Sequence, residues 1–395
     1  MKKKIFTGLT MALCVCINAA GAAYFLKDGG AGDALTPETA HGSITTVFNK
    51  VNPAGGDTIV VCGNFGLAAN YVAPAHTGEV VITQVYNGVD YRTNEDQSIN
   101  YFYDKTIGRR FTMNGPVKFE NINFKSGGGS PTYILFIANY HPITMGKGIY
   151  VDDSGFAYTG TSSSLCILGG YQDTKASASR DLDARITIES GKFMVIGFNR
   201  NEGSGATYTG NSYIDVSGGE ITHILGSELT GMGGNLNVNV SGGKVSGTIY
   251  AGYQSIDPAK NSGSRSSEVT ISAGDFSTCQ AIIGLLADED LNAGKTSSID
   301  YCTHSQRSDI ADLASGFTTV ADCFATGIEN AVNGGMQIRI VGKTVILPSG
   351  IQDKAEVFNM TGHRVYSGFN TEIELPQSGV YAVKINETIE KILIQ

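Results

Sequence analysis

One short phrase occurs four times in the middle of this chain. The segments RITIESGKF, YIDVSGGEI, NVNVSGGKV and EVTISAGDF align on Gly191, Gly219, Gly243 and Gly274, which are 28, 24 and 31 residues apart. Branched apolar residues stand five and three places before each glycine, with polar residues between them. This alternation is typical of a strand with one buried face. A unit of this length cannot bury that face alone, so successive units must stack.

The apolar positions change parity at each aligned glycine. Two places beyond it come Phe193, Ile221, Val245 and Phe276. We therefore expect a bend or bulge there, which glycine permits. A second apolar motif recurs in each unit, as LCILGGY, FMVIGFN, THILGSE, GTIYAGY and QAIIGLL. Each unit thus supplies two short strands, and the sequence predicts an all-β chain folded as a parallel β-solenoid.

Other all-β folds fit the pattern less well. A sandwich of hairpins would show strands joined by two-residue Asn-Gly or Asp-Gly turns. A propeller blade needs about 40 or more residues per repeat. The repeats here are shorter, and like positions recur at the spacing of a coil.

The N-terminus predicts export. Three lysines are followed by an apolar stretch to about residue 20 and by small residues, the layout of a cleaved signal peptide. The apolar stretch is shorter than the roughly 20 residues of a membrane-spanning helix, and we expect no transmembrane segment. The predicted layout is a signal peptide over 1–22, a solenoid over 23–325, a linker over 326–335 and a C-terminal domain over 336–395.

Charge and cysteine usage limit the partners. The net charge is −9, and removal of Lys2, Lys3 and Lys4 gives −9 − 3 = −12, so nucleic acid is a poor partner. The five cysteines beyond the signal peptide are too sparse for a disulfide framework. Cys302 and Cys323 are candidates for a disulfide.

Residues 24–65 (YFLKDGGAGDALTPETAHGSITTVFNKVNPAGGDTIVVCGNF) combine a strand, a Gly-rich turn and an amphipathic segment. Thr36 is a candidate N-cap with Pro37 at the first helical position, and a short helix there would close the end of the solenoid core. With GPVKFENINF at 115–124, this entry resembles the right-handed parallel β-helix proteins of the pectate-lyase-like superfamily. The resemblance implies a right-handed β-helix over about 24–325.

Residues 336–395 alternate like the strands of a small β-sandwich. The stretches VFNMTGHRV (357–365) and SGVYAVKI (378–385) resemble the type A-like C-terminal sorting domain of type IX secretion cargo in Bacteroidetes. That resemblance implies contact with the secretion machinery and a final location outside the cell or on its outer surface. The positions that match the sorting motif are Gly362, Leu375, Pro376, Gly379, Tyr381 and Lys384.

The sequence carries few signs of catalysis. It contains no GxSxG, GxGxxG or GxxxxGK[ST] motif and no paired histidines. Glu189 and Asp215 are predicted one rung apart with an offset of two residues, about 8 Å between Cα atoms, a spacing that permits a glycosidase pair. Asp152 is a third catalytic candidate, and with Asp153 it could bind calcium, although DDSG also suggests a turn. Thr187 and Asn239 flank Asp215 in its column, which also fits a purely structural polar ladder.

Two functions therefore remain open. The first is a non-enzymatic module that binds a glycan or another surface partner, with Tyr213, Asn237, Asn239 and Tyr250 as candidate ligand-binding residues and no required cofactor. The second is a polysaccharide lyase or glycoside hydrolase acting on an acidic polysaccharide through Glu189, Asp215 or Asp152, with Lys118 among the cations that could face acidic sugar. The alternating charges Lys192, Glu220, Lys244 and Asp275 predict ion pairs between rungs.

Overall fold

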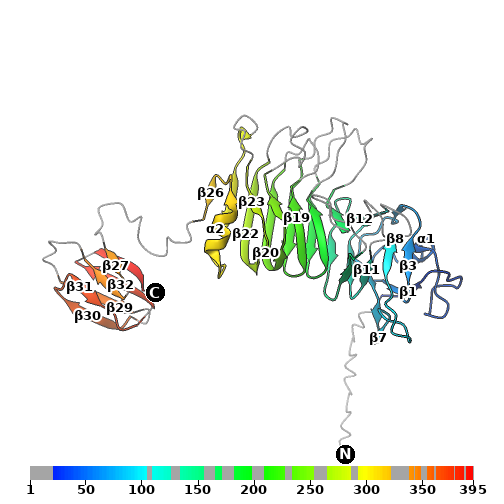
Figure 1. Ribbon diagram of the computed structural model, residues 1–395, viewed down its shortest axis with the longest axis horizontal. Coiled ribbons are helices and arrows are strands. Elements are labelled where there is room, and N and C mark those ends of the chain that lie inside the picture. The colour runs from blue at the N-terminus through cyan, green and yellow to red at the C-terminus, as the bar shows by residue number, and fades with distance from the viewer. Residues whose placement is uncertain are drawn as a thin grey trace, which may run out of the picture. The chain divides into compact units, whose positions relative to one another are not determined.

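The computed structural model describes residues 21–104, 109–125, 134–154, 165–170, 182–197, 209–226, 234–252, 265–285, 292–321, 338–341, 343–347, 354–359, 362–377, 379–386 and 388–394 (Figure 1). These residues are almost entirely strands and turns, with short helices α1 (Ile44–Phe48) and α2 (Arg307–Leu313). The chain divides into two compact units, residues 1–299 with 308–319 and residues 300–307 with 320–395. The predicted signal peptide and linker lie almost wholly outside the described residues and stay predictions.

The first unit contains a sheet of 20 strands in two series. Strands of the first series pair in the order β1 (Ala23–Leu26), β2 (Thr58–Val61), β5 (Val80–Thr83), β10 (Val117–Glu120), β13 (Ile143–Met145), β16 (Ala184–Ile188), β18 (Ser212–Val216), β20 (Leu236–Val245), β22 (Ser267–Asp275), β24 (Ser297–Asp300) and β26 (Thr319–Val320). Strands of the second series pair in the order β4 (Tyr71–Val72), β9 (Arg110–Thr112), β12 (Ile134–Ile137), β15 (Leu165–Leu168), β17 (Lys192–Ile196), β19 (Glu220–Leu225), β21 (Thr248–Tyr250), β23 (Ala281–Ile283) and β25 (Ala314–Ser315). From β15 onward the chain visits the two series in turn, as a solenoid requires.

Two smaller sheets complete this unit. A third series of parallel strands has the order β14 (Tyr150–Asp152), β11 (Asn123–Lys125), β8 (Phe102–Asp104) and β3 (Phe65–Leu67). Strands β6 (Val85–Tyr86) and β7 (Val89–Asp90) form a hairpin. Its turn residues Asn87 and Gly88 have φ of 49° and 79°, the left-handed pair that a tight hairpin favours.

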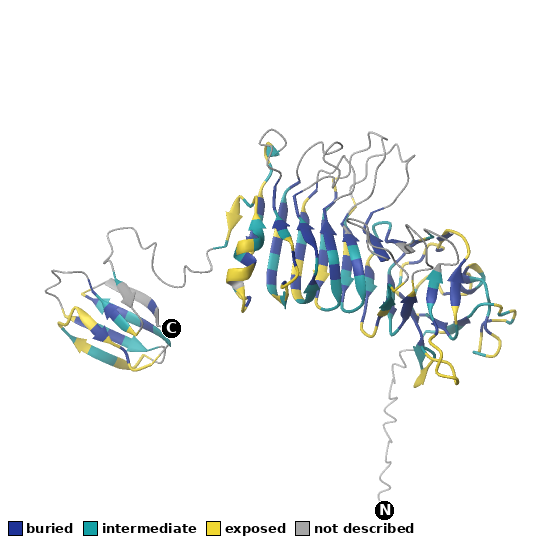
Figure 2. Cartoon of the chain, viewed as in Figure 1, coloured by how far each residue is buried: buried dark blue, intermediate teal, exposed yellow. Residues whose placement is uncertain are grey.

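The register confirms the predicted stacking of the aligned segments. Ile186 pairs with Ile214, and both are 1% exposed. The apolar columns continue through Val238 and Val269 on β20 and β22. Dark-blue buried positions alternate with paler ones along these strands (Figure 2). Every ladder of the large sheet whose register is described is parallel.

The aligned glycines occupy the conformation that the parity change predicts. Gly191, Gly219, Gly243 and Gly274 have φ of 91°, 74°, 76° and 131°. A Cβ on Gly219 would lie 2.6 Å from the carbonyl oxygen of Gly191, the glycine of the preceding coil. Glycine is therefore required twice at this corner, for the backbone angle and for the close approach of stacked backbones.

The middle strands of the second series are buried on both faces. Ile167, Ile224 and Ile249 point into the solenoid, and Ile137, Leu168 and Leu225 on the other face are also at most 1% exposed. Parallel strands covered on both sides read as continuous apolar runs, which explains motifs such as LCIL. In the first series, by contrast, only the inner face is covered, and the outer positions are polar.

Arg265 is an unusual member of the interior. Its guanidinium is fully buried and donates to the carbonyl oxygens of Gly226 (2.7 Å) and Gly234 (2.9 Å) and to Ser212 Oγ (3.3 Å). Burial lowers the pKa of Arg265 to about 9. Because its partners follow β19, precede β20 and open β18, Arg265 ties neighbouring coils together at one corner.

The predicted N-terminal helix begins in the wrong place. The helix starts at Ile44 with Ser43 as its N-cap, not at Thr36. Residues 31–41 instead run beside β1, where Phe25 donates to the Ala34 carbonyl and His41 donates to the Phe25 carbonyl. These hydrogen bonds to a strand edge outweigh the local helix signals of Thr36 and Pro37. The apolar side of the predicted amphipathic segment is buried, since Ala40, Ile44, Val47, Phe48 and Val51 all lie in the core.

The second unit contains two antiparallel sheets. One has the order β27 (Arg339–Val341), β28 (Thr344–Ile346) and β31 (Glu372–Glu374), and the other β30 (Arg364–Gly368), β29 (Ala355–Asn359), β32 (Gly379–Ile385) and β33 (Thr388–Ile394). Val345, Val357, Ile373 and Val383, from both sheets, belong to one buried cluster. Cys302, also in this unit, is disulfide-bonded, whereas its predicted partner Cys323 lies outside the described residues.

Candidate functional site

The predicted outward residues form two rows across β16, β18, β20 and β22. The first row is Arg185, Tyr213, Asn237 and Glu268, and the second is Thr187, Asp215, Asn239 and Thr270. We call this surface the ladder face. It contains three of the four predicted ligand-binding residues and one of the three predicted catalytic residues.

Asp215 is engaged within its own row. Its exposed carboxylate accepts a hydrogen bond from Asn239 Nδ2 at 3.2 Å. Glu189 follows Ile188, the partner of Val216, so it has the predicted offset of two residues from Asp215. The predicted register offset is therefore present, and the Asp215 carboxylate is held by an amide from the neighbouring rung.

Glu189 belongs to a second group of charges around Lys118. Lys118 Nζ lies 2.6 Å from Glu120 Oε2. This hydrogen bond, followed by weaker attraction to Glu120, Glu189 and Glu79, raises the pKa of Lys118. A Cβ on Gly146 would lie 2.9 Å from Lys118 Cε, so the lysine side chain fills the space that this glycine leaves. Lys118 thus stays protonated and neutralises carboxylates of neighbouring coils.

The side chains of Tyr213 and Asn237 each contact other residues of the solenoid. The Arg185 guanidinium carbon lies 4.2 Å from the centroid of the Tyr213 ring and covers one of its faces. Asn237 Nδ2 donates to the Ser212 carbonyl at 3.3 Å.

Tyr250 lies away from these residues. It ends β21 in the second series, where it pairs in register with Leu225. Its half-buried ring packs against an apolar cluster that includes Cys166, Leu168 and Leu225. The structure therefore does not bring Tyr250 together with Tyr213, Asn237 and Asn239.

The predicted charge column is confirmed at the corner of the solenoid. Lys192 is opposite Glu220, Glu220 is opposite Lys244, and Lys244 is opposite Asp275. Lys192 Nζ lies 3.7 Å from Glu220 Oε1 and 2.9 Å from Asp153 Oδ2. These groups are about one third exposed, so each pair adds only tenths of a kcal/mol, roughly 0.2–1.

Asp152 lies on β14 of the third series, in the coil whose strand β13 pairs with β16 of the ladder face. Its Oδ1 accepts hydrogen bonds from the backbone N–H (3.1 Å) and hydroxyl (2.6 Å) of Ser154, the turn that the sequence suggested. Its Oδ2 lies 3.4 Å from Lys125 Nζ. The Ser154 hydroxyl, and then the Ser154 N–H and Lys125, lower the pKa of Asp152. Among the described residues, no group of three or more His, Cys, Asp or Glu side chains is placed to hold a metal ion.

The sequence interpretation missed the neighbours of Asp152. Lys125, Tyr101, Tyr103 and Tyr150 surround it on the third series. The signal was present in YFY, NFK and YVD, where an apolar central residue is flanked by polar or tyrosine side chains. Strands of three residues are too short to stand out by periodicity.

The predicted sorting residues divide into internal and surface positions. Leu375 and Tyr381 are 2% exposed, and Tyr381 Oη donates to the Gln377 carbonyl at 2.9 Å. Gly362 and Gly379 have φ of 80° and 152°. Pro376 is exposed, and Lys384 lies opposite Glu356 on β29. Only Pro376 and Lys384 present side chains that a partner could contact.

Comparison of the chain with protein families, with curated proteins and with solved structures gave no match. Within the described residues, none of the helices has the length and apolar character needed to cross a membrane.

Proposed function

We propose that the chain is a secreted or cell-surface-attached protein that binds a glycan or another surface partner without catalysing a reaction. Its first unit would be a right-handed parallel β-helix of the pectate-lyase-like kind, with α1 at its N-terminal end. Its second unit would be a C-terminal sorting sandwich that a type IX-like secretion system recognises.

The observation that carries this proposal is the pairing on the ladder face. Asp215 accepts from Asn239, and Arg185 covers Tyr213. Side chains held in this way form a fixed array of donors, acceptors and one aromatic face, at the regular spacing of the rungs. Such an array suits binding to a repetitive surface, because little side-chain entropy is lost when the ligand arrives.

Two features support export. Cys302 is disulfide-bonded, and disulfides persist mainly outside the reducing cytoplasm. In the second unit, Pro376 and Lys384 are the surface-facing members of the sorting motif. Expression of the full chain in a host with a type IX system, and in the same host without it, tests this part. Retention in the periplasm of the second host only is expected; equal export from both would contradict it.

The alternative function is cleavage of an acidic polysaccharide. The group formed by Lys118, Glu120 and Glu189 favours it most, because a lysine beside carboxylates can act in such reactions. A lysine that serves as a general base needs a lowered pKa, whereas contact with Glu120 raises the pKa of Lys118. The charge group therefore suits a cross-coil ion network better than a base.

One experiment separates the two functions. The full-length protein is incubated with acidic and neutral polysaccharides, with and without calcium, while bound polysaccharide, unsaturated uronates and new reducing ends are measured. We expect binding without product, weakened by Tyr213→Ala and Asn239→Ala. Product that disappears in Glu189→Ala or Lys118→Met would establish the enzyme instead. Thr270→Ala, at the far end of the same row, is the matched control.

A further inference from the structure

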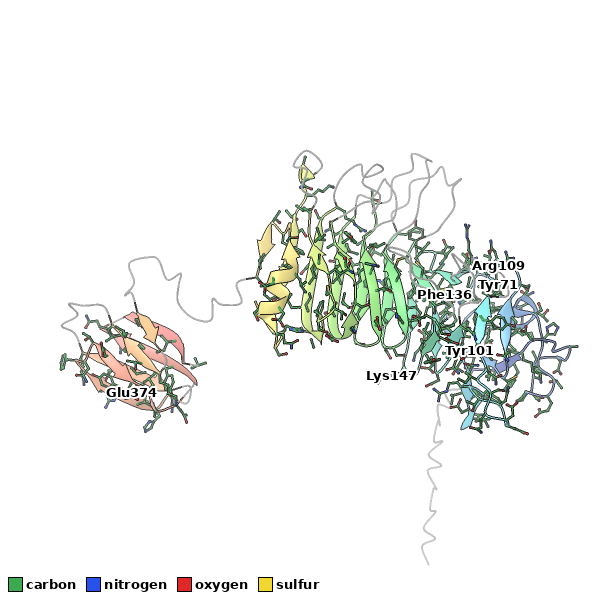
Figure 3. The ribbon with its side chains drawn as sticks, in the orientation of Figure 1. Tyr71, Tyr101, Arg109, Phe136, Lys147 and Glu374 are labelled. Atoms are coloured by element: carbon green, nitrogen blue, oxygen red, sulfur yellow. The ribbon has the colours of Figure 1, made fainter. Side chains whose placement is uncertain are left out.

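A second surface of the solenoid has the composition of a ligand site. On the outer side of the third series, Tyr103, Lys125 and Asp152 stand opposite one another on β8, β11 and β14. Tyr101 and Tyr150 flank this row. Figure 3 labels Tyr101 near the N-terminal coils. We call these five residues the tyrosine face.

The two charges of the tyrosine face are held in a fixed arrangement. Lys125 Nζ lies 3.4 Å from Asp152 Oδ2 and 5.1 Å from the centroid of the Tyr101 ring. Ser154 binds the other carboxylate oxygen of Asp152. The Lys125 side chain is 46% exposed, whereas that of Asp152 is 14% exposed. The ammonium group therefore has donors left for a ligand, and the carboxylate both orients it and keeps a small exposed part.

The aromatic residues differ in exposure and complete the surface. Tyr103 Oη donates to Asp28 Oδ2 at 3.0 Å, which fixes its ring at one end of the row. The Tyr101 ring is half-buried beneath Lys125. Burial, followed by the nearby charge of Asp152 and by Tyr150, raises the pKa of Tyr101, so its hydroxyl stays protonated. Tyr150 is 52% exposed and offers its ring to solvent.

We propose that the tyrosine face binds an uncharged sugar unit of a polysaccharide, at a site separate from the ladder face. Sugar C–H groups pack on the exposed Tyr150 ring, and adjacent hydroxyls bond to the Lys125 ammonium and the Asp152 carboxylate. A neighbouring donor and acceptor match a pair of hydroxyls, since each hydroxyl both donates and accepts. The aromatic ring supplies apolar contact at low entropy cost.

The charges of the tyrosine face disfavour an acidic sugar as its ligand. Lys125 is neutralised by Asp152, and Asp28 adds a second negative group at the end of the row. The chain as a whole carries a net charge of −9. A uronate or sulfate would have to compete with Asp152 for the single ammonium group and would meet repulsion from both carboxylates.

The test uses the full-length protein and affinity electrophoresis in gels that contain mannan, xylan, a β-glucan, polygalacturonate or alginate. We expect the tyrosine face to cause retardation by at least one neutral polysaccharide, and Tyr150→Ala to leave any retardation by the acidic ones unchanged. Tyr150→Ala and Lys125→Met should each weaken this binding about tenfold, whereas Tyr150→Phe should leave it unchanged. Because Tyr150 is exposed, its replacement should not disturb folding.

Tyr213→Ala separates this site from the ladder face. It should leave unchanged the binding that Tyr150→Ala weakens, even if the ladder face proves to bind nothing. Three results would overturn the inference: no neutral polysaccharide retards the protein, binding survives both Tyr150→Ala and Lys125→Met, or only acidic polysaccharides bind.

Discussion

Replacement of Gly243 by alanine tests the central feature of the fold. Gly243 has φ of 76°, which costs an L-residue about 1–2 kcal/mol. The new Cβ would also lie 2.7 Å from Gly218 C and from Gly219 O, which are backbone atoms of the preceding coil. Forced contacts of this kind cost about 1–3 kcal/mol. We expect Gly243→Ala to lower the free energy of unfolding of the first unit by about 2–5 kcal/mol.

Two control variants separate the cost of the backbone angle from the cost of the close contact. Gly88 has a similar φ of 79°, but an added Cβ would have no described neighbour within 4 Å, so Gly88→Ala reports the backbone term alone. A Cβ on Gly242 would lie 2.4 Å from the Ser217 carbonyl oxygen without a positive φ, so Gly242→Ala reports the contact term. The assay is urea-induced unfolding of the full chain, followed by far-ultraviolet circular dichroism. If Gly243→Ala destabilises no more than Gly88→Ala, close stacking at the corner is not what the glycines provide.

Three further predictions concern single side chains. The Tyr71 hydroxyl is buried without a hydrogen-bond partner among the described residues, so Tyr71→Phe should raise the free energy of unfolding by about 1 kcal/mol. A lower free energy of unfolding in the same urea assay would show that the hydroxyl has a partner. Asp152 has a lowered pKa, so its stabilising contribution is present above the unfolded value of about 4 and is lost as the pH falls towards the folded value. Thermal unfolding should therefore show Asp152→Asn less stable than the native chain at pH 7, with the difference shrinking below pH of about 4; a gap that persists at low pH would implicate packing. Tyr381→Phe should lower the free energy of unfolding of the second unit by about 1 kcal/mol, because it removes the hydrogen bond to the Gln377 carbonyl. If the calorimetric transition temperature of the second unit does not change, water replaces this bond.

Sequence reasoning succeeded where one physical rule dominates. The strands of the first series are covered on the inner face, so Ile214 and Asp215 differ sharply in burial and the period of two is visible. A bend at Gly219 was likewise predicted, because apolar parity changes across it, and its positive φ is consistent with that bend. The helix start failed because hydrogen bonds from Phe25 and His41, which no local pattern encodes, hold residues 31–41 beside a strand.

The candidate site was harder to predict than the fold. Asp215 and Glu189 have the predicted offset, and Asn239 was predicted beside Asp215, whereas the approach of Lys118 to Glu189 from another coil emerges only from the structure. The row on β8, β11 and β14 was missed because each strand has three residues and because Tyr103, Lys125 and Asp152 share no chemical type. A column of dissimilar residues leaves no repeat in the sequence, although the backbone repeats.

The three series of strands do not offer equal opportunities for binding. On the second series, Leu168 and Leu225 are buried on the outer face, so that face is already occupied and Tyr250 packs into it. The first and third series keep polar outer positions, such as Asn239 and Lys125, at the surface. If the outer strand faces of the solenoid bind a ligand, as we propose, we expect it on the first and third series. Since they lie on different sheets of one stack, a single long polysaccharide would have to bend around a corner to reach both. Independent loss of binding in Tyr213→Ala and Tyr150→Ala is therefore the expected behaviour, and strongly coupled loss would mean that one ligand spans the corner.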